Sequence, residues 1–168
     1  MDVIIEERGK LFAQTHDARL AEIQTQLKSE RYRDDADALL VLADALRVSS
    51  HSEELLDLPT ETLLVWLHTF LDFLRCRDEL VKVEPFEPAD GATYLMVSTP
   101  DAPYLVDSLK ILLQRRRYRS AIISHPIFST ERRDGILQSL SQVDGPGLEE
   151  SFMLVQVECE QAVCSELV

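Results

Sequence analysis

Glycine, the residue of phosphate-binding turns, is scarce in this sequence. The 168 residues include five glycines, and none of them forms a Gly-x-Gly-x-x-Gly turn or a P-loop. The Gly-x-Ser-x-Gly elbow and the His-Glu-x-x-His pair are also missing, so the common hydrolase classes have no support in the sequence. A self-standing enzyme is therefore the function class that the sequence favours least, although carboxylates distant in sequence can still meet in space.

Metal-ligating and disulfide-forming residues are equally sparse. The three cysteines, Cys76, Cys159 and Cys164, are an odd number without a Cys-x-x-Cys pair, which indicates neither a disulfide framework nor a zinc site. The four histidines are scattered, and no two share a spacing that would direct them at one ion. We therefore expect free thiols and no metal site.

Positive charge is in the minority. Thirty acidic residues against 17 basic ones give a formal charge of −13, which repels phosphate backbones and argues against general nucleic-acid or anionic-membrane binding. No apolar run approaches the roughly 18 residues of a spanning helix, and the acidic N-terminus lacks the basic region of a signal peptide. We therefore expect a cytoplasmic protein.

Helical periodicity dominates the first half of the chain. Apolar residues at helical spacing predict one long helix over residues 3 to 28 and a second over 35 to 47, which Asp34 or Asp35 would cap. A third helix follows Pro59 and ends near Arg77, with Leu67, Phe70 and Leu74 on its buried face. Residues 1–78 are thus predicted to be a helical N-terminal segment.

From residue 81 the pattern changes to that of strands. Residues 81 to 84 and 94 to 98 read as strands, 104 to 117 as a helix, and 120 to 128 as a strand with an edge, a bulge or an irregular end at Pro126. The Asp134-Gly135 pair predicts a tight reversal, and residues 151 to 157 form the last strand.

The order from residue 94 onward is strand, helix, strand, strand. This is the first part of a ferredoxin-like split βαβ fold, in which a helix packs on an antiparallel sheet. Eleven residues, 158 to 168, are too few for the second helix and the fourth strand. We therefore predict an α+β protein whose second domain, residues 79–168, is truncated before its second helix and has an open sheet edge.

One strand-to-helix turn, Ser98 to Ser108, is the most informative stretch for function. Free N–H groups at a helix start bind carboxylates, so one interpretation is a small-molecule site. The other is that Asp101 merely caps the helix and Pro103 starts it. The candidate site residues are Thr99, Asp101, Pro103, Tyr104, Asp107, Ser108 and His125.

His125 and a group of arginines each have two interpretations. A lone histidine on a strand is more often a packing or hydrogen-bonding residue than a functional imidazole. The arginines either dock an acidic neighbour or are only a solvated helix end and hairpin tip. They are Arg115, Arg116, Arg117, Arg119, Arg132 and Arg133.

Four short motifs then appear in one order. They are Pro103-Tyr104-Leu105-Val106-Asp107-Ser108, His125-Pro126-Ile127, Arg132-Arg133-Asp134-Gly135 and Glu150-Ser151-Phe152-Met153. This succession resembles the ACT-like domain in the N-terminal region of the large bacterial NAD-specific glutamate dehydrogenases, over roughly Leu58 to Val157. Two positions differ: Thr99-Pro100 stands where the family usually has Asn-Asp, and a glycine typical of amino-acid-binding ACT domains is missing near Ala102 or Tyr104.

The resemblance implies a non-catalytic regulatory or assembly domain, an incomplete ACT-like βαββ unit behind a helical segment. The parent enzyme would convert L-glutamate, NAD and water to 2-oxoglutarate, ammonia and NADH in later domains. We thus expect no catalytic, cofactor-binding or metal-binding residue in this chain, with NAD bound elsewhere in the parent. Its partners would be the other domains of a homo-oligomeric enzyme. The alternative is an amino-acid-sensing ACT module with an effector at the Ser98–Ser108 turn.

Overall fold

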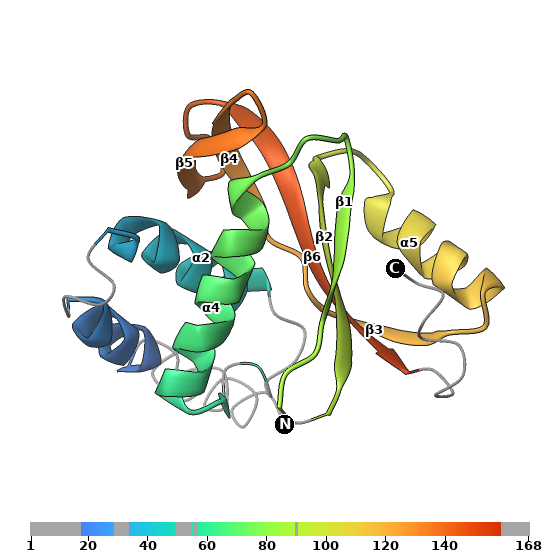
Figure 1. The fold of residues 1–168 in the computed structure, drawn as a ribbon, viewed down its shortest axis with the longest axis horizontal. Coiled ribbons are helices and arrows are strands. Elements are labelled where there is room, and N and C mark those ends of the chain that lie inside the picture. Colours follow the sequence, from blue (N-terminus) through green and yellow to red (C-terminus); the bar gives the residue numbers. More distant parts are fainter. Residues whose placement is uncertain (1–17, 29–33, 50–54, 56, 90, 159–168) are drawn as a thin grey trace, which may run out of the picture.

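In the part of the chain that the structure describes, helical segments precede an antiparallel sheet of six strands (Figure 1). The computed structural model describes residues 18–28, 34–49, 55, 57–89 and 91–158. This α+β arrangement confirms the predicted fold class and is consistent with an ACT-like domain. Of the long helix predicted over residues 3 to 28, residues 18–27 are helical, and the preceding part lies outside the described residues.

The two longer helices of the N-terminal half match their predicted positions. Helix α2 (Ala36–Ser49) buries Leu39, Leu42 and Leu46, the apolar residues that predicted it. Helix α4 (Thr60–Arg75) follows Pro59 and buries a broad stripe. The stripe is broad because α4 packs both on the other helical segments and on the sheet. The buried apolar residues of α4 are Leu63, Leu64, Trp66, Leu67, Phe70, Leu71, Phe73 and Leu74.

The sheet has the order β1-β2-β6-β4-β5, with β3 also paired to β6, and all pairs are antiparallel. Its strands are β1 (Lys82–Phe86), β2 (Thr93–Pro100), β3 (Arg119–Ser124), β4 (Ile127–Arg133), β5 (Ile136–Gln142) and β6 (Leu148–Glu158). Helix α5 (Leu105–Arg115) connects β2 to β3. The predicted strand, helix, strand succession is therefore confirmed in β2, α5 and β3. The single strand predicted over residues 120 to 128 is instead two strands, β3 and β4, which β5 and β6 follow.

Strands β3 and β4 pair with opposite ends of the same edge of β6. Ser124 lies opposite Leu154 and Ile127 lies opposite Ser151, with His125 and Pro126 between the two paired segments. Proline has no N–H for a ladder hydrogen bond, and here the carbonyl of Pro126 accepts from the N–H of Phe152 at 3.0 Å. The irregularity predicted at Pro126 is thus a break between β3 and β4, and beyond it β4 pairs with β6 on one side and with β5 on the other.

Alternating side chains give the sheet two apolar faces. Tyr94 and Met96 of β2 point toward α2 and α4, whereas Leu95 and Val97 lie in a second cluster with Leu113 of α5. This alternation follows from the two-residue period of a strand. Helices therefore cover both faces, with α2 and α4 on one side of the sheet and α5 on the other (Figure 1).

One expectation about the sheet was wrong. The edge of β2 was predicted to be open because the fourth strand of the split βαβ fold would be missing, but β1 pairs antiparallel with β2 along that edge. The order of elements along the chain could not reveal this pairing, because β1 precedes the unit that it completes. The predicted division at residues 78 and 79 stays a prediction; one hydrophobic cluster includes residues of both α4 and the sheet.

Candidate functional site

The Ser98–Ser108 turn leaves the sheet at Pro100 and enters α5 at Leu105. Asp101 does not cap this helix: its backbone N–H donates to the carbonyl of Glu149 at 2.9 Å, and its carboxylate accepts from Ser151 Oγ at 2.5 Å. The position before the helix belongs instead to Tyr104, which has a φ of 66° and no side-chain capping bond. The prediction that Asp101 caps and Pro103 starts the helix was therefore wrong, because Asp101 is held by the neighbouring strand.

Asp101 and His125 are brought near each other through a residue that was not predicted as a site. Ser151 Oγ donates to Asp101 and lies 3.1 Å from His125 Nε2. Since the single hydroxyl proton is directed at Asp101, Ser151 accepts from the imidazole. Ser151 is fully buried, so this Asp–Ser–His chain does not present a nucleophile to solvent. It ties the turn after β2 to the break between β3 and β4.

The other candidate residues are not gathered into a pocket. Pro103, Tyr104, Asp107 and Ser108 are exposed along the start of α5, and Tyr104 is 79% exposed, whereas Thr99 is buried in β2 opposite Ser151. Neither of the two hollows described below is lined by any of them. The geometry therefore does not favour an enclosed effector site at this turn.

A second polar cluster joins the last two sequence motifs. The carboxylate of Glu150 accepts from Arg132 Nε at 2.8 Å, from Arg132 Nη2 at 3.0 Å and from Arg77 Nη2 at 2.7 Å. The same arginines also donate to backbone carbonyls: Arg132 to Leu74 and Gly135, and Arg77 to Leu80. Glu150 thus fixes the end of α4 and the β4–β5 hairpin onto β6.

The environment of Glu150 lowers its pKa. Burial on its own would raise it, but the hydrogen bond and charge of Arg132, with a hydrogen bond from Thr130 and the charge of Arg77, outweigh burial and hold the pKa below its ordinary value. The carboxylate is therefore ionised at neutral pH, and it acts as a structural anion rather than as a proton donor.

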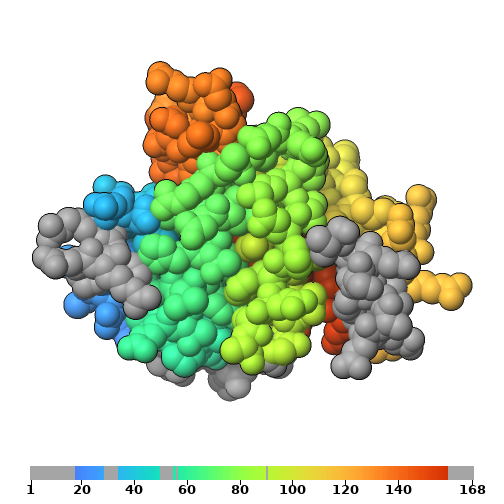
Figure 2. Space-filling model, in the orientation of Figure 1, coloured from blue at the N-terminus to red at the C-terminus, as the bar shows by residue number. Residues whose placement is uncertain are grey.

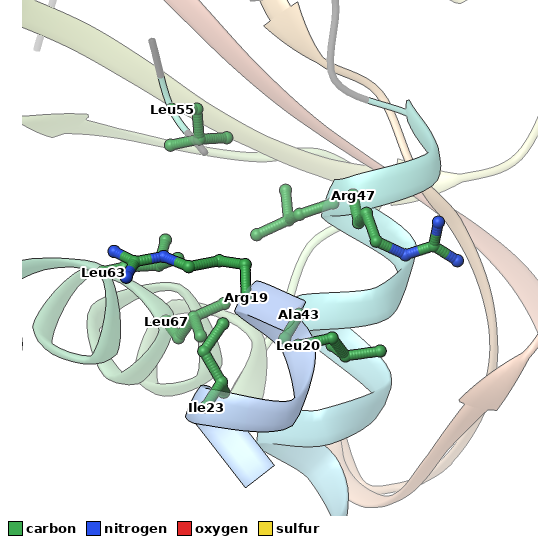
Figure 3. Close-up of a pocket in the computed structure, with 9 residues that line it drawn as sticks. Arg19, Leu20, Ile23, Ala43, Arg47, Leu55, Leu63 and Leu67 are labelled. Carbon is green, nitrogen blue, oxygen red and sulfur yellow. The ribbon is translucent and has the colours of Figure 1, made fainter. Parts of the chain in front are cut away.

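A hollow lies between the helical residues 18–27, α2 and α4 (Figure 3). Its lining is mostly aliphatic, as the labelled Leu20, Ile23, Leu63 and Leu67 show. Arg19 closes one side and donates to Thr60 Oγ1 at 2.6 Å and to the carbonyl of Leu58. The cavity volume is about 20 Å³, room for about one water molecule. It is a packing gap rather than a ligand site.

Within the described ranges, no group of three His, Cys, Asp or Glu residues is placed to hold a metal ion. Cys76 is a free, exposed thiol, and a hydrogen bond to Asp78 raises its pKa, which disfavours the nucleophilic thiolate. Cys159 and Cys164 lie outside the described residues. Among the helices that the structure describes, none is long and apolar enough to cross a membrane.

Taken together, the split βαβ unit, with one helix between β2 and β3, and the buried motif residues define an ACT-like domain. The family model of the glutamate dehydrogenase ACT1 domain matches residues 42–166. The chain therefore belongs to the ACT1 domain family of glutamate dehydrogenase, as the four motifs predicted. Comparisons with curated proteins and with solved structures gave no match.

Proposed function

We propose that this chain is a non-catalytic regulatory and assembly domain of a NAD-dependent glutamate dehydrogenase. The observation that carries the proposal is the family match, which begins within α2 and extends past β6, and so includes the larger part of both the helical layer and the sheet. In this proposal NAD and glutamate bind to other domains of the parent enzyme. The parent is a cytoplasmic homo-oligomer, and this chain contributes contacts rather than chemistry.

The structural roles of several motif residues support a domain that contributes contacts rather than chemistry. The Asp134-Gly135 pair forms the turn between β4 and β5, Glu150 anchors two arginines, and Ser151 links Asp101 to His125. Each of these side chains is held by intramolecular hydrogen bonds or by turn geometry. Residues of the last three motifs are thus occupied in maintaining the shape of the domain.

Deletion of residues 1–168 from the full-length enzyme tests the proposal. We expect the truncated enzyme to retain glutamate-dependent NADH formation per active subunit, with an altered response to amino acids or an altered mass in sedimentation. The purified 168-residue chain should not enhance NADH fluorescence. An unchanged amino-acid response together with an unchanged mass would contradict a regulatory and assembly role, and saturable NADH binding by the isolated chain would contradict its non-catalytic character.

A further inference from the structure

A run of the sequence around the end of α5 has no negative charge. Residues 108–130 contain no Asp or Glu, although the whole chain has 30 of them. The same run contains Lys110, Arg115, Arg116, Arg117 and Arg119, which we call the basic corner. All five are exposed. None of them forms a salt bridge with another residue in the described part of the chain.

The backbone of the basic corner is a Schellman turn. The N–H of Tyr118 donates to the carbonyl of Leu113 at 3.0 Å, and the N–H of Arg117 donates to the carbonyl of Gln114 at 3.0 Å. Tyr118 and Leu113 are both buried against the sheet, as the hydrophobic contact of this motif requires. Because these two side chains point inward, the turn places the arginines between and beside them on the outside of the domain.

Arg117 occupies the position in this turn where glycine is favoured. Its φ is 64°, in the left-handed region that is unfavourable for a residue with a Cβ atom. Cations in the last turn of a helix gain stability from the helix dipole, which accounts for Arg115 but not for a strained arginine beyond the helix. Backbone strain of this kind is retained where the side chain has a use, and stability alone would select glycine.

The surface around these charges has the composition of a protein interface. Ile111 and Leu112 on the same helix are each about half exposed, at 49% and 54%, and arginine beside apolar residues is typical of interface patches. A hollow of about 120 Å³ opens beside Arg119, lined also by Ser120, Ala121, Gln156 and Glu158. The corner lies at the margin of the molecule, where α5 turns into β3 (Figure 2).

We propose that the basic corner is the docking site for an acidic protein surface on another domain or subunit of the parent enzyme. This rests on the proposed function and identifies the surface that carries it. Single-stranded nucleic acids stack their bases on exposed aromatic rings, and the one aromatic ring within the basic corner, that of Tyr118, is buried. The charge of the whole chain also repels phosphate-rich partners. An acidic protein surface satisfies both the exposed arginines and the aliphatic residues next to them.

Arginine-specific chemical labelling can compare the reactivity of the basic corner in the full-length enzyme with its reactivity in the 168-residue chain. In the full-length enzyme we expect Arg115, Arg116, Arg117 and Arg119 to be modified about tenfold more slowly than in the 168-residue chain, and raised salt should reduce the difference. Arg133, an exposed arginine on the β4–β5 hairpin, is the internal control and should react equally in both. Equal reactivity of the corner in both states would overturn the proposal. Protection that appears only when RNA or anionic vesicles are added would also overturn it.

Substitution of Arg117 separates docking from folding. Arg117→Gly should raise the melting temperature of the domain, because glycine adopts the left-handed conformation without strain. The same variant should weaken docking, so that Arg115 and Arg116 in the full-length enzyme lose their protection from labelling. The double variant Arg115→Glu, Arg116→Glu should lose protection at Arg119, whereas Arg133→Gln should not change it. Full protection in the Arg117→Gly and charge-reversed enzymes would overturn the proposal. If deletion of the whole domain changes the amino-acid response or the mass of the enzyme but these variants leave both unchanged and keep full protection, the proposed docking site is wrong and the proposed function stands.

Discussion

Glu150 is the residue at which three separate segments of the chain meet. It is 4% exposed and its partner Arg132 is 12% exposed, so both charges have lost most of their water. A charge of this kind is tolerated only while its partners remain, because an unpaired buried ion is strongly destabilising. Substitutions in this cluster can therefore show whether ion pairs, rather than apolar packing, attach the end of α4 and the β4–β5 hairpin to β6.

Arg132→Ala should lower the free energy of unfolding by about 3 kcal/mol. It removes two hydrogen bonds to Glu150, two more to the carbonyls of Leu74 and Gly135, and one of the two positive charges beside Glu150. The matched control is its neighbour Arg133→Ala. Arg133 is exposed, and its loss should change stability by less than about 0.5 kcal/mol. Urea denaturation of the two variants compares them, and equal effects would show that the ion cluster does not stabilise the fold.

The lowered pKa of Glu150 predicts an acid-sensitive part of the stability. A carboxyl group whose pKa is lower in the folded than in the unfolded state stabilises the fold above its unfolded pKa, and this contribution is lost as the pH falls. The loss should therefore begin near the ordinary value of 4.5 and continue below it. Glu150→Gln should be less stable at neutral pH but should have a flatter dependence of unfolding free energy on pH between about 5 and about 3. A slope equal to that of the wild type would contradict the assignment.

At the scale of elements, the β4–β5 hairpin depends on a glycine that has no room for a side chain. Gly135 has a φ of +80°, and a Cβ there would lie 2.8 Å from the carbonyl oxygen of Arg77 and 2.8 Å from Asp78 Oδ1. Gly91 has the same φ, but nothing lies within 4 Å of its Cβ position. Gly91→Ala should thus cost about 1 kcal/mol from strain alone, and Gly135→Ala about 1–3 kcal/mol more from the clash. Equal losses in thermal denaturation would show that the hairpin shifts to make room.

Helix α4 presents one buried and one exposed face, which gives a second matched pair. Phe70 is fully buried, and its ring centroid lies 5.4 Å from that of Phe86 and 5.4 Å from that of Phe152. Phe70→Ala should cost about 3–5 kcal/mol through lost burial and the cavity it leaves. Val65→Ala on the same helix removes a side chain that is 53% exposed and should cost less than about 1 kcal/mol. An unchanged denaturation midpoint for Phe70→Ala would contradict the packing of α4 on the sheet.

Sequence periodicity predicted elements better than it predicted their contacts. Helices α2, α4 and α5 and the positions of strands β1, β2 and β6 along the chain were predictable because side chains recur with the period of each element. The pairing of β1 with β2 was not, because periodicity does not specify which strand is the neighbour. The capping role of Asp101 was also wrong, since Ser151 on a distant strand binds its carboxylate.

The polar contacts of the candidate residues were not predictable either, for a related reason. Asp101 and His125 share Ser151, but the Glu150 cluster joins residues separated by 73 and by 18 positions, and no local pattern relates such charges. Arg132 and Glu150 both belong to the four motifs, but membership in a motif does not specify which residues are in contact. Arg77 belongs to none of the motifs.

At the scale of the whole molecule, the sheet edge formed by β1 is blocked against pairing with another chain. An outer strand with free N–H and C=O groups is a template for association. β1 has Pro85 at its fourth residue and carries a salt bridge between Lys82 and Glu84 at 3.1 Å. Proline and charges on an edge strand are the usual means by which proteins prevent such pairing. The β2 edge itself offers no such template, because β1 pairs along it and places it inside the sheet.

Pro85→Val should make the β1 edge competent for pairing, because valine restores an N–H group and favours extended backbone. We expect the sedimentation coefficient of this variant to rise with concentration more steeply than that of the wild type. The charge of −13 on each copy opposes association, so the rise should be larger at high salt, where repulsion is screened over a few ångströms. Pro88→Val, the same change beyond the end of β1, is the matched control and should behave like the wild type. An identical concentration dependence for all three proteins would show that Pro85 is not what protects the edge, and that charge repulsion and the Lys82–Glu84 pair are sufficient.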